Sequence, residues 1–111
     1  MAVYAAPGAP GSIVEYRSRY DNFIGGEYVP PVKGDYFVDV TPVTGQPFTE
    51  VARSTAEDVD RAVAAAEKAA PAWGRTSPAE RALVLNRIAD RVEANLERLA
   101  VAETGENGKP V

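Results

Sequence analysis

The spacing of apolar and polar residues changes near residue 54 of the chain. Before this point, short apolar runs alternate with polar residues, as in half-buried strands, and Gly or Pro interrupts them. After it, apolar residues recur every three or four positions, as on one face of a helix. The pattern predicts an α/β chain in which short antiparallel strands over residues 20–53 precede two or three amphipathic helices over residues 54–111.

The first strands are predicted around a pair of glycines. Two β-prone runs, 20–24 and 27–29, lie on either side of Gly25 and Gly26. Both glycines can adopt positive φ without a Cβ clash, which is typical of a tight hairpin. Pro30 and Pro31 should end the second strand because neither can donate to a strand ladder.

Two further strands are predicted over residues 36–41 and 48–52, with a turn at Pro42–Gly45 between them. In the first, Phe37 and Asp39 share one face and Val38 and Val40 share the other. All these strands are short. We therefore expect a small antiparallel unit that is only marginally stable unless it packs on other elements.

The first helix is predicted over residues 54–73. Ser54 and Glu57 form a capping-box signal at its start. Pro71 should kink or end the helix, and Trp73 is interpreted as a core anchor in preference to a ligand-stacking residue. One stripe of the predicted helix carries the apolar residues Val59, Ala62, Val63, Ala66, Ala70 and Trp73.

The second helical run, residues 77–109, has the clearest start signal in the chain. Ser77 is a capping residue, Pro78 occupies the first helical position, and Glu80 completes the box. Asn95 is a candidate internal cap, so the run is predicted to be either one helix or two helices that meet there. Its apolar stripe contains Ala82, Leu85, Ile88, Ala89, Val92, Leu96 and Leu99.

Composition excludes several classes of function. The net charge is −4 and the chain has no basic stripe, so we expect no nucleic-acid partner. It contains neither Cys nor His, which removes thiol nucleophiles, imidazole bases and the usual zinc sites. No secretory leader and no 18-residue apolar run is present, which indicates a cytoplasmic protein without a membrane partner. Residues 1–19 are interpreted as a flexible arm, with attachment to a neighbouring subunit as the alternative.

A linked series of phrases resembles the N-terminal part of the NAD(P)-dependent aldehyde dehydrogenases. In order, these are FIGGEYV, TPVTGQPFTEVA, EDVDRAVAAAEKAAPAW, SPAERALVLNRIADRVEANLERLAVAET and ENGKPV, spread over residues 20–111. The phrase YDNFIGGEYVPPVKGDYF is most similar to bacterial enzymes that act on acetaldehyde and other short aliphatic aldehydes.

The resemblance implies a longer enzyme in which this segment begins the cofactor-binding domain. Such an enzyme oxidises an aldehyde to a carboxylic acid with NAD or NADP and is expected to be a homo-oligomer. Its catalytic Cys, Glu and Asn and its cofactor-binding residues would all follow residue 111. No catalytic or cofactor-binding residue is therefore assigned here, and the isolated segment is expected to be inactive and to bind no cofactor.

The resemblance also implies one possible binding site in this segment. Many members of the family hold a monovalent cation with two strand carbonyls and an acidic side chain. The matching positions are the carbonyls of Asp39 and Val40 and the carboxylate of Glu106. Glu stands where Asp is usual, and Gly105 stands where a large apolar residue is common.

Two alternatives to the enzyme segment remain at this point. One is a standalone helical interaction module whose two apolar stripes bind a partner protein. The other is the product of a truncated gene, without a role of its own.

Overall fold

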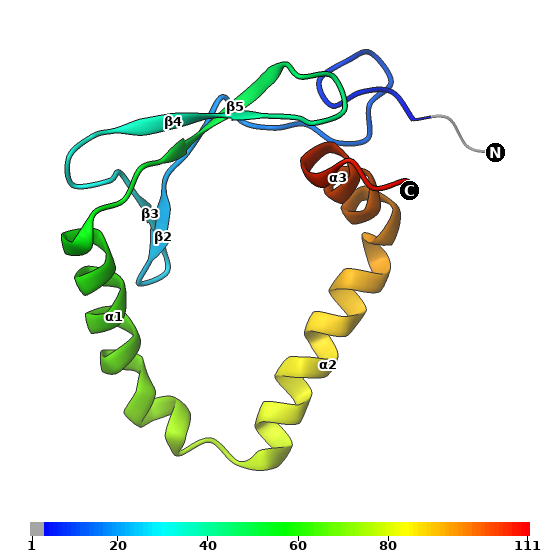
Figure 1. Ribbon diagram of the computed structural model, residues 1–111. Coiled ribbons are helices and arrows are strands. Elements are labelled where there is room, and N and C mark those ends of the chain that lie inside the picture. Colours follow the sequence, from blue (N-terminus) through cyan, green and yellow to red (C-terminus); the bar gives the residue numbers. More distant parts are fainter. Residues whose placement is uncertain (1–3) are drawn as a thin grey trace.

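The computed structural model describes residues 4–111 (Figure 1). Five short strands come first and three helices follow, as the change of period predicts. The strands are β1 (Arg19–Tyr20), β2 (Asn22–Ile24), β3 (Glu27–Val29), β4 (Tyr36–Val40) and β5 (Pro47–Ala52), and the helices are α1 (Ala56–Gly74), α2 (Pro78–Ala94) and α3 (Leu96–Asn107).

Strands β2 and β3 form the predicted hairpin. They pair antiparallel, with Phe23 opposite Tyr28. Gly25 and Gly26 adopt φ values of 64° and 91°, which side chains with a Cβ rarely tolerate. Strand β3 ends at Val29, directly before the two prolines.

The other strands form a three-stranded sheet in the order β1-β5-β4. Strand β4 pairs antiparallel with β5, as expected, but β1 pairs with β5 in parallel through Arg19 and Glu50. The expectation of a small antiparallel unit therefore holds for β2–β3 and β4–β5, but it was wrong for β1. Alternation of apolar residues shows which residues share a face, but it does not specify the direction or the partner of a strand.

Helix α1 begins one residue later than the sequence pattern indicates. Its capping residue is Thr55, and the carboxylate of Asp58 accepts hydrogen bonds from the Thr55 backbone and hydroxyl at 2.8 and 3.1 Å. The predicted Ser54–Glu57 pair was wrong. Ser54 instead donates to Asn22 Oδ1 at 2.9 Å, and these contacts with the hairpin and with Asp58 set the start of the helix.

Pro71 does not end helix α1, which continues to Gly74. A proline this close to the end removes only its own backbone hydrogen bond, and the remaining turn tolerates the loss. Trp73 is 49% exposed, so within the described residues it is not the core anchor that was expected. The guanidinium carbon of Arg81 lies 5.7 Å from the centre of its ring.

The start of α2 confirms the local signals. Ser77 Oγ accepts from the Glu80 N–H at 3.2 Å, and the Glu80 carboxylate accepts from the Ser77 N–H at 2.7 Å. The Glu80 carboxylate also accepts from the Ser77 hydroxyl at 2.9 Å, and the bonds from the Ser77 N–H and hydroxyl hold the pKa of Glu80 below its usual range. Asn95 separates α2 from α3, so the run is two helices, and α3 ends at Gly108 in the left-handed conformation.

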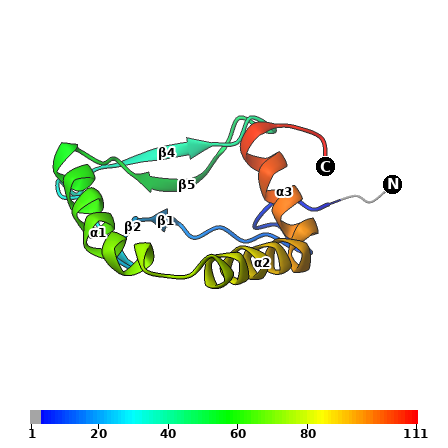
Figure 2. The ribbon, with the colours of Figure 1, turned by 90° about the horizontal axis from the view of Figure 1, so that it is seen from below.

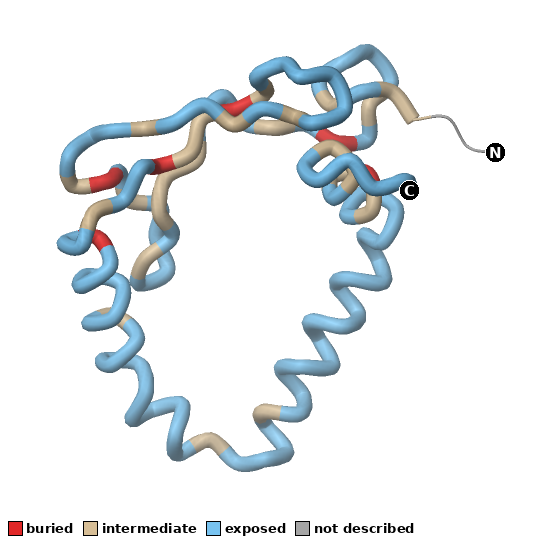
Figure 3. Tube along the Cα trace, in the orientation of Figure 1, coloured by how far each residue is buried: buried red, intermediate tan, exposed pale blue. Residues whose placement is uncertain are grey.

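The elements enclose an open frame (Figures 1 and 2). The radius of gyration is 17.6 Å, whereas a compact domain of this length has about 13 Å. Helices α1 and α2 diverge from their short connection, and most of their length is exposed (Figure 3). The stripes predicted to be buried are exposed here, with Val63 at 51%, Leu85 at 66% and Ile88 at 54%, because no described segment covers them.

The segment before β1 makes specific contacts in residues 4–18. Val14 is 4% exposed, and the Ser18 carbonyl accepts from the Glu50 N–H at 3.1 Å. The end of the arm predicted for residues 1–19 thus takes part in the sheet, because Ser18 is hydrogen-bonded to strand β5 and Arg19 belongs to β1. The first three residues of the arm lie outside the described part of the chain. Its flexibility stays a prediction.

None of the helices in residues 4–111 has the length and apolar character that crossing a membrane requires.

Candidate functional site

The end of strand β4 meets the last turn of helix α3. The Thr41 hydroxyl donates a hydrogen bond to the Gly105 carbonyl, a contact between residues 64 apart in the sequence. A Cβ placed on Gly108 would lie 3.5 Å from Pro42 Cγ, so the two segments also touch at the next residues. Val40 directly precedes Thr41 and Glu106 directly follows Gly105, so the predicted cation-binding positions lie beside this contact.

The backbone at the first two of these positions is irregular. The pairing of β4 with β5 shifts between Asp39 and Val40. Such a shift interrupts the ladder, and it can leave a carbonyl oxygen available for another partner. Irregular pairing at this point is compatible with a role for the two carbonyls as ligands.

The donor chemistry suits a hard cation. Backbone carbonyl and carboxylate oxygens are ligands for hard ions, whereas soft metals prefer sulfur or nitrogen. Residues 4–111 contain no group of three or more His, Cys, Asp or Glu that could hold a metal ion. A site at Asp39, Val40 and Glu106 would therefore depend on one carboxylate and two carbonyls, which favours a monovalent ion. Its occupation stays a prediction.

Tyr16 lies against the same end of helix α3. Its hydroxyl donates to the Ala102 carbonyl at 3.4 Å, and its ring meets Phe48 edge-on at 4.8 Å between centres. Burial raises the pKa of Tyr16, and the negative charges of Glu106 and Asp39 raise it further.

A cavity of about 320 Å³ lies between residues 4–7, the turn that joins β4 to β5, and α3. Its lining contains no carboxylate, amine or guanidinium group. The cavity thus offers packing space, and the Tyr4 and Tyr16 hydroxyls are the titratable side-chain groups on its lining. It is lined by Tyr4, Ala5, Ala6, Pro7, Tyr16, Thr41, Val43, Thr44, Gln46, Pro47, Phe48, Val101, Thr104, Gly105 and Val111.

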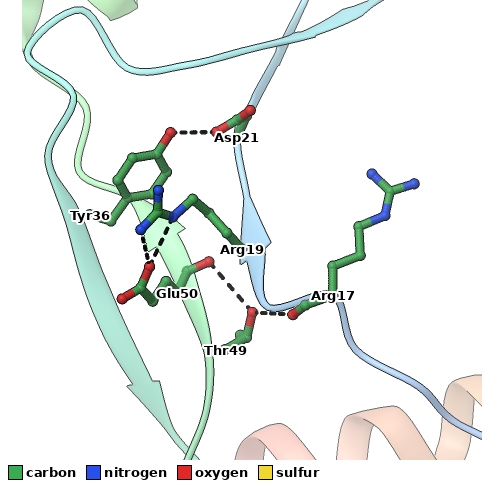
Figure 4. Close-up of polar contacts among 6 residues, drawn as sticks. All are labelled: Arg17, Arg19, Asp21, Tyr36, Thr49 and Glu50. Carbon is green, nitrogen blue, oxygen red and sulfur yellow. Dashed lines mark hydrogen bonds and ion pairs between the residues drawn. The ribbon is translucent and has the colours of Figure 1, made fainter.

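A second polar cluster joins β1 to its neighbours (Figure 4). Arg19 Nε donates to Glu50 Oε2 at 2.8 Å, and its guanidinium carbon lies 4.0 Å from the centre of the Tyr36 ring. The Tyr36 hydroxyl donates to Asp21 at 2.6 Å, which raises the pKa of Tyr36. These contacts link β1, β4 and β5 to one another and to Asp21, which lies between β1 and β2, so we interpret the cluster as structural.

Sequence reasoning missed Tyr16 and Thr41. Both act through partners more than 60 residues away in the chain, and no local period or cap signal marks them. Thr41 was assigned only to a strand, and Tyr16 only to the N-terminal arm. A contact of this kind could not be found without the tertiary arrangement.

Comparison with known proteins gives consistent results. The model of the aldehyde dehydrogenase family matches residues 28–111. The chain is 68% identical over its whole length to a protein of Streptomyces coelicolor named "Probable aldehyde dehydrogenase", of which it covers 22%. It is 62% identical to the acetaldehyde dehydrogenase of Pseudomonas aeruginosa, over 98% of this chain and 22% of that protein.

The fold also matches solved structures. The NAD-dependent aldehyde dehydrogenase of Sinorhizobium meliloti superposes with a TM-score of 0.78 at 35% identity, over 96% of this chain and 22% of that one. The predicted α/β fold, with short strands followed by helices, is therefore confirmed. The chain spans about a fifth of the length of these proteins.

Proposed function

Because the chain belongs to the aldehyde dehydrogenase family, we propose that it supplies the N-terminal scaffold of an enzyme that oxidises an aldehyde to a carboxylic acid with NAD or NADP. The exposed apolar faces of α1 and α2 carry this proposal. Large patches of this kind are unusual on an independent domain, and they mark surfaces that another segment or partner covers.

The remainder of the cofactor-binding domain is the proposed cover for these faces. Val59 and Val63 on α1, and Leu85 and Ile88 on α2, are all more than half exposed. The matched relatives are about five times longer than this chain, which leaves ample sequence for a nucleotide-binding sheet. Alanines between the large residues of α1 allow close approach of such a sheet.

The chemistry of the proposed reaction requires groups that this chain lacks. A thiolate attacks the aldehyde carbon, hydride passes to the nicotinamide, and water hydrolyses the resulting thioester. The 111 residues contain no Cys and no His. They can therefore support the fold of the enzyme, but they are proposed to be inactive and to bind no dinucleotide when isolated.

We propose a short aliphatic aldehyde as the substrate and a cytoplasmic homo-oligomer as the working form. The similarity to the acetaldehyde dehydrogenase of Pseudomonas aeruginosa supports the substrate class. A monovalent cation held by the carbonyls of Asp39 and Val40 and by Glu106 is part of the same proposal. The Thr41–Gly105 contact supports it because it joins the two segments that carry the ligands.

The test begins with the gene. The reading frame is followed past codon 111, the complete frame is expressed, and reduction of NAD⁺ and NADP⁺ is measured with acetaldehyde and with benzaldehyde. We expect cofactor reduction that is faster with acetaldehyde at equal subsaturating concentration. The 111-residue chain alone serves as the control and should show none. A frame that continues without yielding any aldehyde-dependent reduction would contradict the proposed activity.

An interaction module is the second candidate function. The same exposed faces favour it, because two apolar stripes on diverging helices could receive a partner protein. A stop directly after codon 111, together with a stable monomeric product, would favour the module over the enzyme segment.

A further inference from the structure

Residues 4–16, here called the N-terminal strap, lie along helix α3. The Tyr4 hydroxyl donates to Glu97 Oε1 at 2.7 Å in the first turn of the helix, and the Tyr16 hydroxyl donates to the Ala102 carbonyl at 3.4 Å. Val14 on the strap and Val101 on the helix are 4% and 5% exposed, which makes them two of the few buried apolar residues in the described chain. The strap is thus packed as well as hydrogen-bonded.

The chain that leaves the strap joins helix α3 to strand β5. The Tyr16 ring packs edge-on against Phe48, and the Arg17 carbonyl accepts from the Thr49 hydroxyl at 2.8 Å. Thr49 is itself 8% exposed. In Figure 1 this mid-blue segment, which leads to β1, passes between the sheet and the orange-red helix. Tyr16 is therefore the residue at which the strap, the sheet and the last turns of α3 come together.

We infer that Tyr16 is a positioning residue for the cation site, because it holds the last turn of α3 in place so that Glu106 faces the carbonyls of Asp39 and Val40. The inference depends on the proposed cation site and adds to it a residue outside the ligand set. Its hydrogen bond ends at Ala102, four positions before Glu106 and so one helical turn away. The Thr41–Gly105 contact holds the same turn from the side of the strand.

A small residue at position 105 leaves room for Tyr16 and Pro7 beside the helix. A Cβ placed on Gly105 would lie 3.5 Å from the Tyr16 hydroxyl oxygen and 3.8 Å from Pro7 Cγ. These are ordinary contact distances, so Ala fits at this position. A larger side chain would extend into the space that the strap occupies and would displace either Tyr16 or Pro7. The combination of Gly105 with Tyr16 thus allows the strap to lie directly on the helix.

The test uses the complete enzyme with Tyr16→Phe, which removes the hydroxyl and keeps the ring against Phe48. Thermal unfolding is followed in NaCl and in KCl, each titrated against choline chloride at constant ionic strength, so that general screening does not change. The control is Tyr28→Phe, because this ring is 54% exposed on the separate β2–β3 hairpin. The cation concentration at half-maximal stabilisation is the measured quantity.

We expect the wild type and Tyr28→Phe to share one midpoint for Na⁺ or K⁺. Tyr16→Phe should raise that midpoint roughly two- to tenfold, which is the net contribution of one hydrogen bond expressed as a binding constant. The Tm of Tyr16→Phe could instead fall equally in choline and in the alkali salt while the cation midpoint stays unchanged. That result would show that Tyr16 has a structural role only, and it would overturn the inference.

Two further outcomes separate this inference from the proposed site. If the wild type shows no stabilisation by Na⁺ or K⁺ beyond that by choline, the cation site itself is wrong and the role of Tyr16 fails with it. If Tyr16→Phe does not fold, Phe48→Leu provides the second measurement, because it removes the ring against which Tyr16 packs and leaves the three proposed ligands unchanged. A raised midpoint in Phe48→Leu supports the inference, and a wild-type midpoint contradicts it.

Discussion

The backbone N–H of Val32 donates to Oδ1 of Asp58 at 2.8 Å, across 26 residues of sequence. The other carboxylate oxygen accepts from the Thr55 N–H at 2.8 Å. Asp58 therefore caps helix α1 and also attaches the helix to the loop that follows the β2–β3 hairpin. It is 3% exposed, so both of its roles are performed away from solvent.

Removing this carboxylate should loosen the start of α1 from the loop. Asp58→Ala leaves the Val32 and Thr55 N–H groups without their acceptor, and buried donors of this kind are costly to leave unpaired. We expect a lower Tm for the complete enzyme, measured by thermal unfolding. Asp60→Ala, on the exposed face of the same helix, is the matched control and should change Tm little. Equal effects of the two substitutions would contradict the double role of Asp58.

Because the Asp58 carboxylate titrates, the free energy of unfolding should depend on pH. Hydrogen bonds from Thr55 and Val32 hold the pKa of Asp58 below its usual range. A depressed pKa in the folded state stabilises the protein above the unfolded value, and this contribution disappears as pH falls through the folded value. The difference in unfolding free energy between wild type and Asp58→Asn should therefore shrink from about pH 4 downward. Denaturant titrations at several pH values measure it, and a difference that grows toward acid would contradict the assignment.

The hairpin turn should be sensitive to a single methyl group. Gly26→Ala places a Cβ on a residue with φ of 91°, and the left-handed conformation costs an L residue about 1–2 kcal/mol. Gly74→Ala is the control because Gly74 belongs to α1 and an added Cβ meets no atom within 4 Å. It should be neutral or stabilising by up to about 1 kcal/mol. Denaturant unfolding of the complete enzyme compares the two, and a neutral Gly26→Ala would contradict the turn geometry.

The exposed face of α2 provides a direct test of whether the rest of the enzyme covers it. If Leu85, now 66% exposed, is buried in the complete protein, Leu85→Ala should cost about 2–5 kcal/mol of unfolding free energy. If the face stays in solvent, the cost should be within about 0.5 kcal/mol. Arg87→Ala, on the charged face of the same helix, is the control and should be close to neutral. Denaturant unfolding distinguishes the two cases.

The isolated 111-residue chain should be partly unfolded or should aggregate. Val59, Val63 and Trp73 on α1 are about half exposed, and α2 adds a second apolar face. Circular dichroism during heating should show no cooperative transition, and sedimentation should show species larger than a monomer. A cooperative transition with a monomeric profile would contradict this expectation.

Local signals predicted the elements whose stabilising contacts lie within a few residues. The Gly25–Gly26 turn and the Ser77–Glu80 box depend on neighbours no more than four positions away, and the structure confirms both. At Asn95, where the sequence left one helix or two open, the structure has two helices, without a capping hydrogen bond from the Asn95 side chain. The start of α1 differs by one residue for a related reason. The acceptor Asp58 is shared with Val32, and that partner is too distant in sequence for a capping pattern to include it.

In the candidate site, too, sequence identified individual residues, whereas the contacts between distant residues required the structure. The positions of Asp39, Val40 and Glu106 came from resemblance between sequences, whereas the contact between Thr41 and Gly105, which joins their two segments, is seen only in the tertiary structure. The parallel pairing of β1 with β5 and the packing of Tyr16 on α3 are also contacts between distant residues. Periodicity indicates which face of an element is apolar because that depends on backbone geometry alone. Which segment covers that face depends on the packing of the whole chain, and only the tertiary structure shows it.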